Sequence, residues 1–472
     1  MSDIIKFSIS KTLEFDTVVI GGGVAGSAAA VSSARLGAKT LLVESDGSLG
    51  GQAGAGLVTP LSSVRSASGV LFGGILQEIF EQVHSLTKKY VSFDYKDPPY
   101  RTPSPHVTKY VLLKMASDAN VTMLFHTSLA GAETDGDKIK NVVLLTKSGF
   151  IKVYAKNFID ATGDADLVCL SGDEFVLGRE ADVFDQLAMA GLDTAHAEGE
   201  HSDPYKQKNL MQPASLFFIM RGVDTEKAAT FNNKNLYFGD LGITKERFEQ
   251  WEFAGTLGFT VTDERIPTPQ NRVLISVGRH SDEAVVNMSR VTDVNGADAF
   301  SLSEGEVKAG LQIIAIVDFL KTFIPGFENA YLSETSSHLG IRESRRLVGR
   351  YKLSGTDVIF GKKFADTVAK GHYLIDIHDP RGKFGAVGGS IKSDHFEIPF
   401  RSLCSKKFNN LLAVGKCISA DHIANSATRI QGPCILTGQA AGTAAALKKD
   451  GACNVDVELL RKTLKESGVN LD

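Results

Sequence analysis

Residues 17–44 read TVVIGGGVAGSAAAVSSARLGAKTLLVE, and this stretch decides the fold. Its apolar ends, 17–20 and 40–43, predict two strands, and the alanine-rich stretch between them predicts a helix. Three glycines in succession predict a tight turn before the helix, and Gly37 stands where the helix should end. A strand, a helix and a second strand in this order are typical of a parallel sheet, so we expect an α/β fold.

The glycine turn has the spacing of a dinucleotide-binding site. Gly21 makes the tight turn, Gly23 lets the backbone approach a pyrophosphate, and Gly26 lets the helix pack on the strand. The helix N-terminus presents N–H groups and a partial positive charge to the phosphates. Glu44 ends the second strand, where an acid accepts hydrogen bonds from a ribose and disfavours a 2′-phosphate. The residues that we assign to the nucleotide here are Gly21, Gly23, Val24, Ala25, Gly26, Glu44 and Ser45.

The composition is that of an ordinary globular protein. The chain has 472 residues, of which 43% are hydrophobic and 22% charged, and its net charge is −4. This length predicts more than one domain, and the lack of a basic run argues against nucleic acid or an anionic membrane as a partner. We see no apolar signal segment and no CxxC pair among the five cysteines. We therefore expect a cytoplasmic protein without a thioredoxin-type disulfide, a metal site or an iron–sulfur cluster.

The middle of the chain alternates between helical and strand-like patterns. Five glycines within 47–56 predict a loop whose backbone passes close to a flat ligand. We expect helices over 71–88, 106–118, 303–323 and 336–352, strands over 121–126, 214–221 and 271–278, a hairpin of 139–146 with 150–155, and an irregular proline-rich segment at 97–105. Ser303 and Glu306 have the spacing of a capping box at the start of the third of these helices.

An apolar run followed by an Ala/Gly-rich stretch, the pattern of the opening residues, occurs again near the C-terminus. Residues 410–415 predict a buried strand, and Gly432-Pro433-Cys434 predicts the start of a long Ala/Gly-rich helix that ends near Gly451. The sequence between these two regions has a different pattern, in which strand-like and helical runs alternate, and this predicts an inserted substrate domain. The expected division is a discontinuous nucleotide-binding domain of residues 1–178 and 396–472, and a substrate domain of residues 179–395.

The segments described so far resemble a known family. The matching stretches are GGQAGAGLV (50–58), IDATGDAD (159–166), GIRESRR (340–346), IDIHDP (375–380), IPFRSL (398–403) and GQAAG (438–442). Over residues 15–448 the chain is similar to FAD-dependent oxidoreductases with the two-dinucleotide-binding-domain flavoprotein fold, related to glutathione reductase and p-hydroxybenzoate hydroxylase. The resemblance implies a discontinuous Rossmann-like FAD-binding domain, an inserted α+β substrate domain, and FAD rather than NAD at the glycine turn.

The resemblance also extends the expected cofactor site. The further FAD contacts are Gly50, Gly51, Gln52, Leu129, Ala161, Thr162, Gly163, Gly415, Lys416, Gly432, Pro433 and Cys434. The helix that begins at 432–434 would point its N-terminus at the N1–C2=O edge of the flavin. Lys416 stands where many relatives carry an aspartate, which implies that it pairs with the pyrophosphate instead. Cys434 has two interpretations, a reactive thiol at a helix N-terminus or a small packed residue.

Candidate catalytic residues lie in the inserted domain and before the final helix. Arg342 and Arg345 are three apart on an expected helix, where they would grip a carboxylate or phosphate together. The alternative is a salt-bridged helix face that uses Glu343. His378 is flanked by two aspartates, which suits either a general base or a structural histidine in a turn. His422 is a further candidate to face the flavin. The weaker candidates are Arg429 and Tyr373.

The function that the resemblance implies is a hydride transfer between a small organic substrate and N5 of FAD, with an electron acceptor or donor of unknown identity. A disulfide reductase of this fold needs a second GxGxxG and a redox CxxC, and we find neither in the sequence. The alternatives are a flavin monooxygenase, an electron-transfer module that resembles the flavoprotein subunit of heterodisulfide reductase, and an isomerase or hydratase without net redox chemistry. The sequence names neither the substrate nor the oligomeric state.

Overall fold

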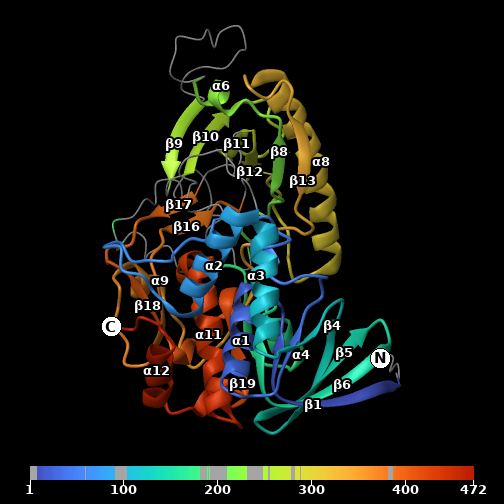
Figure 1. Cartoon of the computed structure of the whole chain (residues 1–472), viewed down its shortest axis with the longest axis vertical. Helices are drawn as coiled ribbons and strands as arrows, with labels where there is room; N and C mark the ends of the chain where they lie inside the picture. The colour runs from blue at the N-terminus through green and yellow to red at the C-terminus, as the bar shows by residue number, and fades with distance from the viewer. Residues whose placement is uncertain are drawn as a thin grey trace.

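Figure 1 shows the computed structural model of the chain, in which two sheets lie at opposite ends of the long axis. The described residues are 8–58, 60–90, 104–180, 189, 191, 210–230, 248–253, 256–277, 282–287, 289–380 and 386–472. Among them, we find no helix that combines the length and the apolar composition needed to cross a membrane.

The first sheet contains the N-terminal fingerprint. Its strands are β1 (Ile9–Ile20), β2 (Thr40–Val43), β3 (Thr122–Leu124), β4 (Ser128–Asp135), β5 (Lys138–Thr146), β6 (Gly149–Asp160) and β19 (Leu411–Ala413). Within the described part of the chain the order is β3-β2-β1-β6-β5-β4, and β19 pairs with β6. Strands β3, β2, β1, β6 and β19 are parallel neighbours, whereas β4, β5 and β6 form an antiparallel meander. The expected parallel α/β sheet and the expected hairpin are both confirmed.

Strand β6 changes its neighbour along its length. Residues 149–154 pair with β5, and residues 158–160 pair with β19, while β1 runs along the other side of the strand. The run expected at 150–155 is therefore part of a longer strand that continues to Asp160. This arrangement brings a segment from near the C-terminus into the N-terminal sheet, beside the carboxyl end of β6.

Two helices from opposite ends of the sequence pack backbone to backbone behind this sheet. They are α1 (Val24–Arg35) and α11 (Gln431–Leu447), which lie side by side in Figure 1. A Cβ on Gly438 would lie 2.0 Å from the carbonyl oxygen of Ala25, and one on Gly442 would lie 2.1 Å from that of Ala29. Only glycine permits this approach, so the Ala/Gly composition of both helices is explained by their contact.

The helices around this pair largely match the expectations. They are α2 (Gly74–Tyr90), α3 (Pro105–Asp118), α4 (Asp166–Leu170), α9 (Gly355–Ile359), α10 (His422–Thr428) and α12 (Val457–Glu466). Helix α3 begins at Ser104, whose hydroxyl accepts a hydrogen bond from the Val107 amide, and α1 ends before Gly37, which has a φ of +85°. The proline-rich segment 97–105 lies mostly outside the described residues.

The second sheet lies in the upper half of Figure 1, with a long helix along one side. Its described strands have the order β13 (Tyr331–Thr335), β8 (Phe218–Arg221), β12 (Ala284–Val286), β11 (Arg272–Val277), β10 (Thr256–Thr262) and β9 (Phe248–Phe253). The helix is α8 (Ala299–Phe323), and α6 (Thr225–Thr230) lies near the end of the sheet. A separate apolar core forms here from β8, β10–β12 and the buried face of α8. The strands expected at 214–221 and 271–278 are thus present with shorter bounds.

Two helical expectations are wrong, one in part and one entirely. Helix α8 begins four residues before Ser303, because the side chain of Asp298 accepts the hydrogen bond from the Ser301 amide, while Ser303 donates to the Ala299 carbonyl from inside the helix. The expected helix 336–352 is not formed. Its residues instead contain the strand β14 (Arg345–Leu347), which pairs with β7 (Phe175–Leu177).

The segment that follows supplies the remaining short sheets. Strand β15 (Thr367–Gly371) pairs with β18 (Phe396–Pro399), and β16 (Ile375–His378) pairs with β17 (Ala386–Gly389). Apolar residues of this segment, such as Ile375 and Ile398, belong to the same core as α1 and α11. The domain boundaries at 178/179 and 395/396 stay a prediction.

Candidate functional site

The turn between β1 and α1 distinguishes two packed glycines from an open one. A Cβ on Gly21 would lie 2.4 Å from the Ala161 carbonyl oxygen, and one on Gly26 would lie 1.8 Å from the Gly21 oxygen. A Cβ on Gly23 would meet no described atom within 4 Å. Gly23 is the N-cap of α1, and the first turn of this helix, which is described in full, holds no acidic side chain. The amide groups of Val24 and Ala25 therefore begin the helix at an open and electropositive position.

Glu44 fixes the loop beside this turn. Its carboxylate accepts hydrogen bonds from the Gly22 amide at 2.6 Å, the Asp46 amide at 2.8 Å and the Ser45 hydroxyl at 3.0 Å. The following loop returns to the turn, because the Gly50 amide donates to the Gly22 carbonyl at 2.9 Å. Glu44, Ser45 and the loop residues 50–52 are thus brought together with the open end of α1.

The carboxyl end of β6 adds the next group of expected cofactor residues. Asp160 is fully buried and accepts hydrogen bonds from the Thr162 amide at 3.1 Å and hydroxyl at 2.7 Å, which shape the turn through Ala161, Thr162 and Gly163. Lys416 lies across this turn, and its ammonium group donates to Asp164 and to the Ile341 carbonyl, both at 2.9 Å. The ammonium group that was expected to pair with a pyrophosphate therefore has a carboxylate partner within the protein.

The N-terminus of α11 lies against other expected cofactor residues. The Gly415 amide donates to the Thr437 hydroxyl of α11 at 3.1 Å, and the Gly432 amide donates to the Ser62 carbonyl at 3.2 Å. Cys434, which follows Pro433, is buried, and burial raises the pKa of its thiol to about 12. Of the two interpretations of Cys434, the packed residue fits this environment.

Leu129 lies apart from these turns in β4, where it pairs with Leu144 and packs on the core of the first sheet. Its expected role, a backbone contact to the adenine, stays a prediction.

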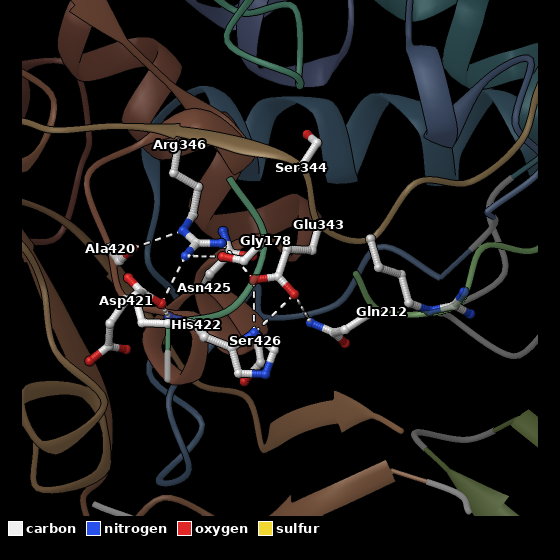
Figure 2. Close-up of polar contacts among 12 residues, drawn as sticks. Gly178, Gln212, Glu343, Ser344, Arg346, Ala420, Asp421, His422, Asn425 and Ser426 are labelled. Atoms are coloured by element: carbon white, nitrogen blue, oxygen red, sulfur yellow. Dashed lines mark hydrogen bonds and ion pairs between the residues drawn. The ribbon is translucent and has the colours of Figure 1, made fainter. Parts of the chain in front are cut away.

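A buried network of charged and polar groups lies beside α10, and we call it the Glu343 network. Its members are Gly178, Glu180, Gln212, Glu343, Arg346, Ala420 and His422. Figure 2 labels all of them except Glu180. Glu343 accepts hydrogen bonds from His422 Nδ1 at 2.8 Å, from Arg346 Nη1 at 2.6 Å and from Gln212 Nε2 at 3.3 Å. Arg346 also donates to Glu180 at 3.0 Å, so two carboxylates face one guanidinium and one imidazole. Burial raises the pKa of Glu343, but His422 and Arg346 more than offset this effect and lower it to about 2.

A second group of charges lies where β16 meets the segment before α11, and we call it the arginine cluster. It consists of Arg290, Arg342, Arg429, Asp376 and His378. Arg290 Nη1 lies 3.1 Å from His378 Nδ1, and His378 Nε2 lies 3.3 Å from an oxygen of Asp376. Arg429 donates to the Asp376 carboxylate at 3.4 Å and to the Arg342 carbonyl at 3.1 Å.

The electrostatics of this cluster identify the state of its histidine. Burial and the neighbouring arginines lower the pKa of His378 to about 3, against the opposing effect of Asp376. His378 is therefore neutral at pH 7. Because Arg290 can only donate, Nδ1 of His378 accepts and Nε2 carries the proton that faces Asp376. Burial also lowers the pKa of Arg342, with Arg290 and Arg429 adding to the effect, to about 9.

The structure separates the arginines that the sequence placed on one helix face. Arg345 donates to Asp166 and to the Asp164 carbonyl, Arg346 joins the Glu343 network, and Arg342 donates to the Pro213 carbonyl at 2.6 Å and the Ser215 hydroxyl at 3.0 Å. The expected joint grip of Arg342 and Arg345 is wrong, because this segment is extended and its side chains diverge. The alternative pairing with Glu343 applies to Arg346.

Three residues of the site were missed in the sequence. Arg290 stands alone among uncharged neighbours, Gln212 lies in a polar stretch, and Glu180 follows an isolated strand, so none belongs to a spacing that predicts chemistry. Gln212 connects the two charged groups, because its Oε1 accepts from the His378 amide at 3.0 Å and its Nε2 donates to Glu343.

The residues at the open end of α1 and at α10 fit a bound FAD. Buried polar atoms without a hydrogen-bond partner in the described part of the chain include Gln52 Oε1, Asn425 Oδ1 and Thr428 Oγ1. Each adjoins an expected cofactor segment: Gln52 is one itself, Asn425 donates to the Lys416 carbonyl, and the Thr428 carbonyl accepts from Cys434. Buried polar groups normally have partners, so these atoms and the open space at Gly23 suit a polar ligand.

Comparison with known proteins identifies the family of the chain. The family model described as FAD dependent oxidoreductase matches residues 16–464, so the chain belongs to this family, and it is an enzyme whose cofactor is FAD. No curated protein matches the chain.

Solved structures also resemble the chain at low identity. A geranylgeranyl bacteriochlorophyll reductase-like protein from Thermoplasma acidophilum is 12% identical over 97% of this chain and 85% of its own, with a TM-score of 0.41. A myxobacterial chondrochloren halogenase is 11% identical over 96% and 78%, with a TM-score of 0.44. The p-nitrophenol 4-monooxygenase of Pseudomonas putida is 13% identical over 97% and 81%, with a TM-score of 0.39. No property of these proteins is transferred to this chain.

Proposed function

We propose that this FAD-dependent oxidoreductase transfers a hydride between FAD and a small organic substrate that lies beside the arginine cluster. The observation that supports this most directly is the connection between the cluster and the expected cofactor residues. Arg429 precedes Gly432 by three residues, and the Arg342 carbonyl accepts a hydrogen bond from it. Lys416 donates to the carbonyl of Ile341, the neighbour of Arg342. Cofactor and substrate would therefore share one site.

The cofactor's position in this proposal follows from the glycine turn and α11. The open end of α1 at Gly23 would hold the pyrophosphate, and Glu44 would accept hydrogen bonds from the ribose. When bound, FAD accepts or donates a hydride, and positive charge near the N1 side of its ring stabilises the reduced form. The N-terminus of α11 and Arg429 would supply that charge.

The residues of the arginine cluster would orient the substrate. In the arrangement described above, both ring nitrogens of His378 are engaged, one by Arg290 and one by Asp376. We therefore give His378 a positioning role for these two neighbours in place of the expected role as a general base. Nδ1 of His422 is likewise engaged by Glu343, so we give His422 a structural role in the Glu343 network in place of the expected catalytic one.

Anaerobic reduction of the FAD-loaded protein by a panel of metabolites tests this proposal. A substrate should bleach the flavin absorbance at ~450 nm without any added nicotinamide, because hydride transfer changes the flavin directly. Reduction by NADPH that becomes fast only when the substrate is present would contradict the proposal and indicate a monooxygenase. Turnover with an unchanged flavin spectrum would indicate an isomerase or hydratase instead.

A further inference from the structure

The arginine cluster gathers three guanidinium groups in one place. Arg342 and Arg429 act on Asp376, and Arg290 interacts with both Asp376 and the buried Asp379. Burial raises the pKa of Asp376, but its basic neighbours more than offset this effect and lower the pKa, so the carboxylate stays charged. An anion bound beside these guanidinium groups would be stabilised by them.

Arg342 also has hydrogen-bond donors to spare. Only its Nη1 makes hydrogen bonds within the described residues, to the Pro213 carbonyl and the Ser215 hydroxyl. These bonds leave the edge formed by Nε and Nη2, which presents two parallel N–H groups. The excess of donors at this position is the pattern expected of a site that receives an acceptor from outside the protein.

Tyr373 is a further donor among the groups that act on Arg342. Its phenol group interacts electrostatically with Asp376, Arg429 and Arg342, and its hydroxyl makes no hydrogen bond in the part of the chain that the structure describes. Burial raises the pKa of this hydroxyl to about 12, so it keeps its proton at neutral pH and remains a donor.

From these observations, and resting on the function proposed above, we infer that the substrate is a small organic carboxylate whose carboxylate group is bound by the Nε–Nη2 edge of Arg342 and the hydroxyl of Tyr373. Arg290 and Arg429 contribute positive charge, and Arg429 joins this subsite to the N-terminus of α11. A planar carboxylate fits the two coplanar N–H groups of a guanidinium edge. Its charge also complements the guanidinium groups that lie around this subsite.

Direct binding measurements on the FAD-loaded protein test the inference without any turnover. Propionate and its neutral isostere propionamide are titrated at constant ionic strength by calorimetry and by the shift of the flavin absorbance. Propionate should bind at least about tenfold more tightly, because a charge-assisted hydrogen bond contributes more than a neutral one. Equal affinities would overturn the inference, and tighter binding of inorganic phosphate would overturn the choice of a carboxylate.

Three variants attribute that affinity to the named residues. Arg342→Gln should weaken propionate binding about tenfold, and Tyr373→Phe, which removes only a hydroxyl, about threefold. Arg35→Gln is the matched control, because it also removes one guanidinium. Arg35 lies at the end of α1 and forms a surface ion pair with Glu78 of α2, so this substitution should leave the affinity unchanged. Wild-type affinity in Arg342→Gln, or in Tyr373→Phe if the arginine variant does not fold, would overturn the assignment. If only neutral metabolites reduce the flavin, this inference fails while the proposed function stands.

Discussion

The Glu343 network and the arginine cluster contain the same kinds of residue but differ in how their hydrogen-bonding groups are used. In the network, Glu343 and Glu180 face Arg346 and His422, and Glu343 accepts bonds from three side chains. In the cluster, Arg342 keeps an unused donor edge within the described structure. Charged groups that are paired with one another stabilise the fold, whereas an unused donor edge is suited to bind a ligand.

The largest expected effect comes from removing the central acid of the network. Glu343→Gln should lower the free energy of unfolding by roughly 3–5 kcal/mol at pH 7, because it removes the buried carboxylate that Arg346 and His422 share. Denaturant unfolding of the FAD-loaded protein measures this loss. Asp376→Asn should also be destabilising, and propionate should restore part of the loss only in this variant, because only the arginine cluster is expected to bind an anion. Rescue of Glu343→Gln by propionate, or no rescue of Asp376→Asn, would remove the distinction between the two groups.

The stability contributed by Glu343 should depend on pH in one direction. Its pKa is about 2 in the folded protein and near 4.5 when unperturbed, so its contribution is complete above about pH 4.5 and is lost as the pH falls towards 2. The difference in unfolding free energy between the wild type and Glu343→Gln should therefore stay constant from pH 7 to 5 and shrink below that. A difference that persists at pH 3 would show that packing, rather than charge, explains the effect of the variant.

The glycines of the cofactor turn differ in a similar way, because a Cβ would collide with backbone atoms at Gly21 and Gly26 but would meet no described atom at Gly23. Gly23→Ala should leave the fold intact, because its Cβ meets no described atom, yet weaken FAD binding on the order of a hundredfold by entering the path of the pyrophosphate. Absorbance of the purified protein at ~450 nm and thermal unfolding separate the two effects. Gly131→Ala is the control, since a Cβ there is equally free of contacts but lies in β4. Full FAD content in Gly23→Ala would place the pyrophosphate elsewhere.

The smallest expected effect concerns the pH dependence of anion binding. The groups that act on Arg342 are Arg290, Arg429, Asp376 and Tyr373, and its pKa is about 9. Propionate affinity should be constant from pH 6 to 8 and fall by up to about tenfold per pH unit above the pKa, which the bound anion itself shifts upward. In Arg342→Gln the dependence above pH 9 should disappear. An affinity that is independent of pH between 6 and 10.5 would contradict the lowered pKa of Arg342.

Much of the first sheet could be predicted from the sequence because its signals are local. Residues 17–44 hold a strand, a glycine turn, a helix and a strand in immediate succession, and each depends on its neighbours in the chain. The start of α11 was located in the same way, by glycine and proline at 432–433. The packing of α1 on α11 was not predicted, although a discontinuous domain was, and the glycine contacts to Ala25 and Ala29 explain the Ala/Gly composition of the two helices.

The site was less predictable than the first sheet, because its geometry depends on residues that are distant in the sequence. Residues 340–346 have the charges of a helix face, but the chain there pairs with residues 175–177 and buries Arg346 against acids that lie 3 and 166 positions away. Tertiary pairing therefore overrides the local pattern. Arg290 belongs to no motif and becomes visible only when the fold brings it to His378, 88 residues along the chain.

The contact between α1 and α11 also sets an order of events during synthesis. Helix α1 ends at residue 35 and α11 begins at residue 431, so the ribosome makes almost 400 residues between them. At ~5–20 residues per second, the alanine-lined surface of α1 stays without its permanent neighbour for on the order of 20–80 seconds. The surface of α1 that α11 covers in the finished protein is therefore complete only when translation is nearly finished.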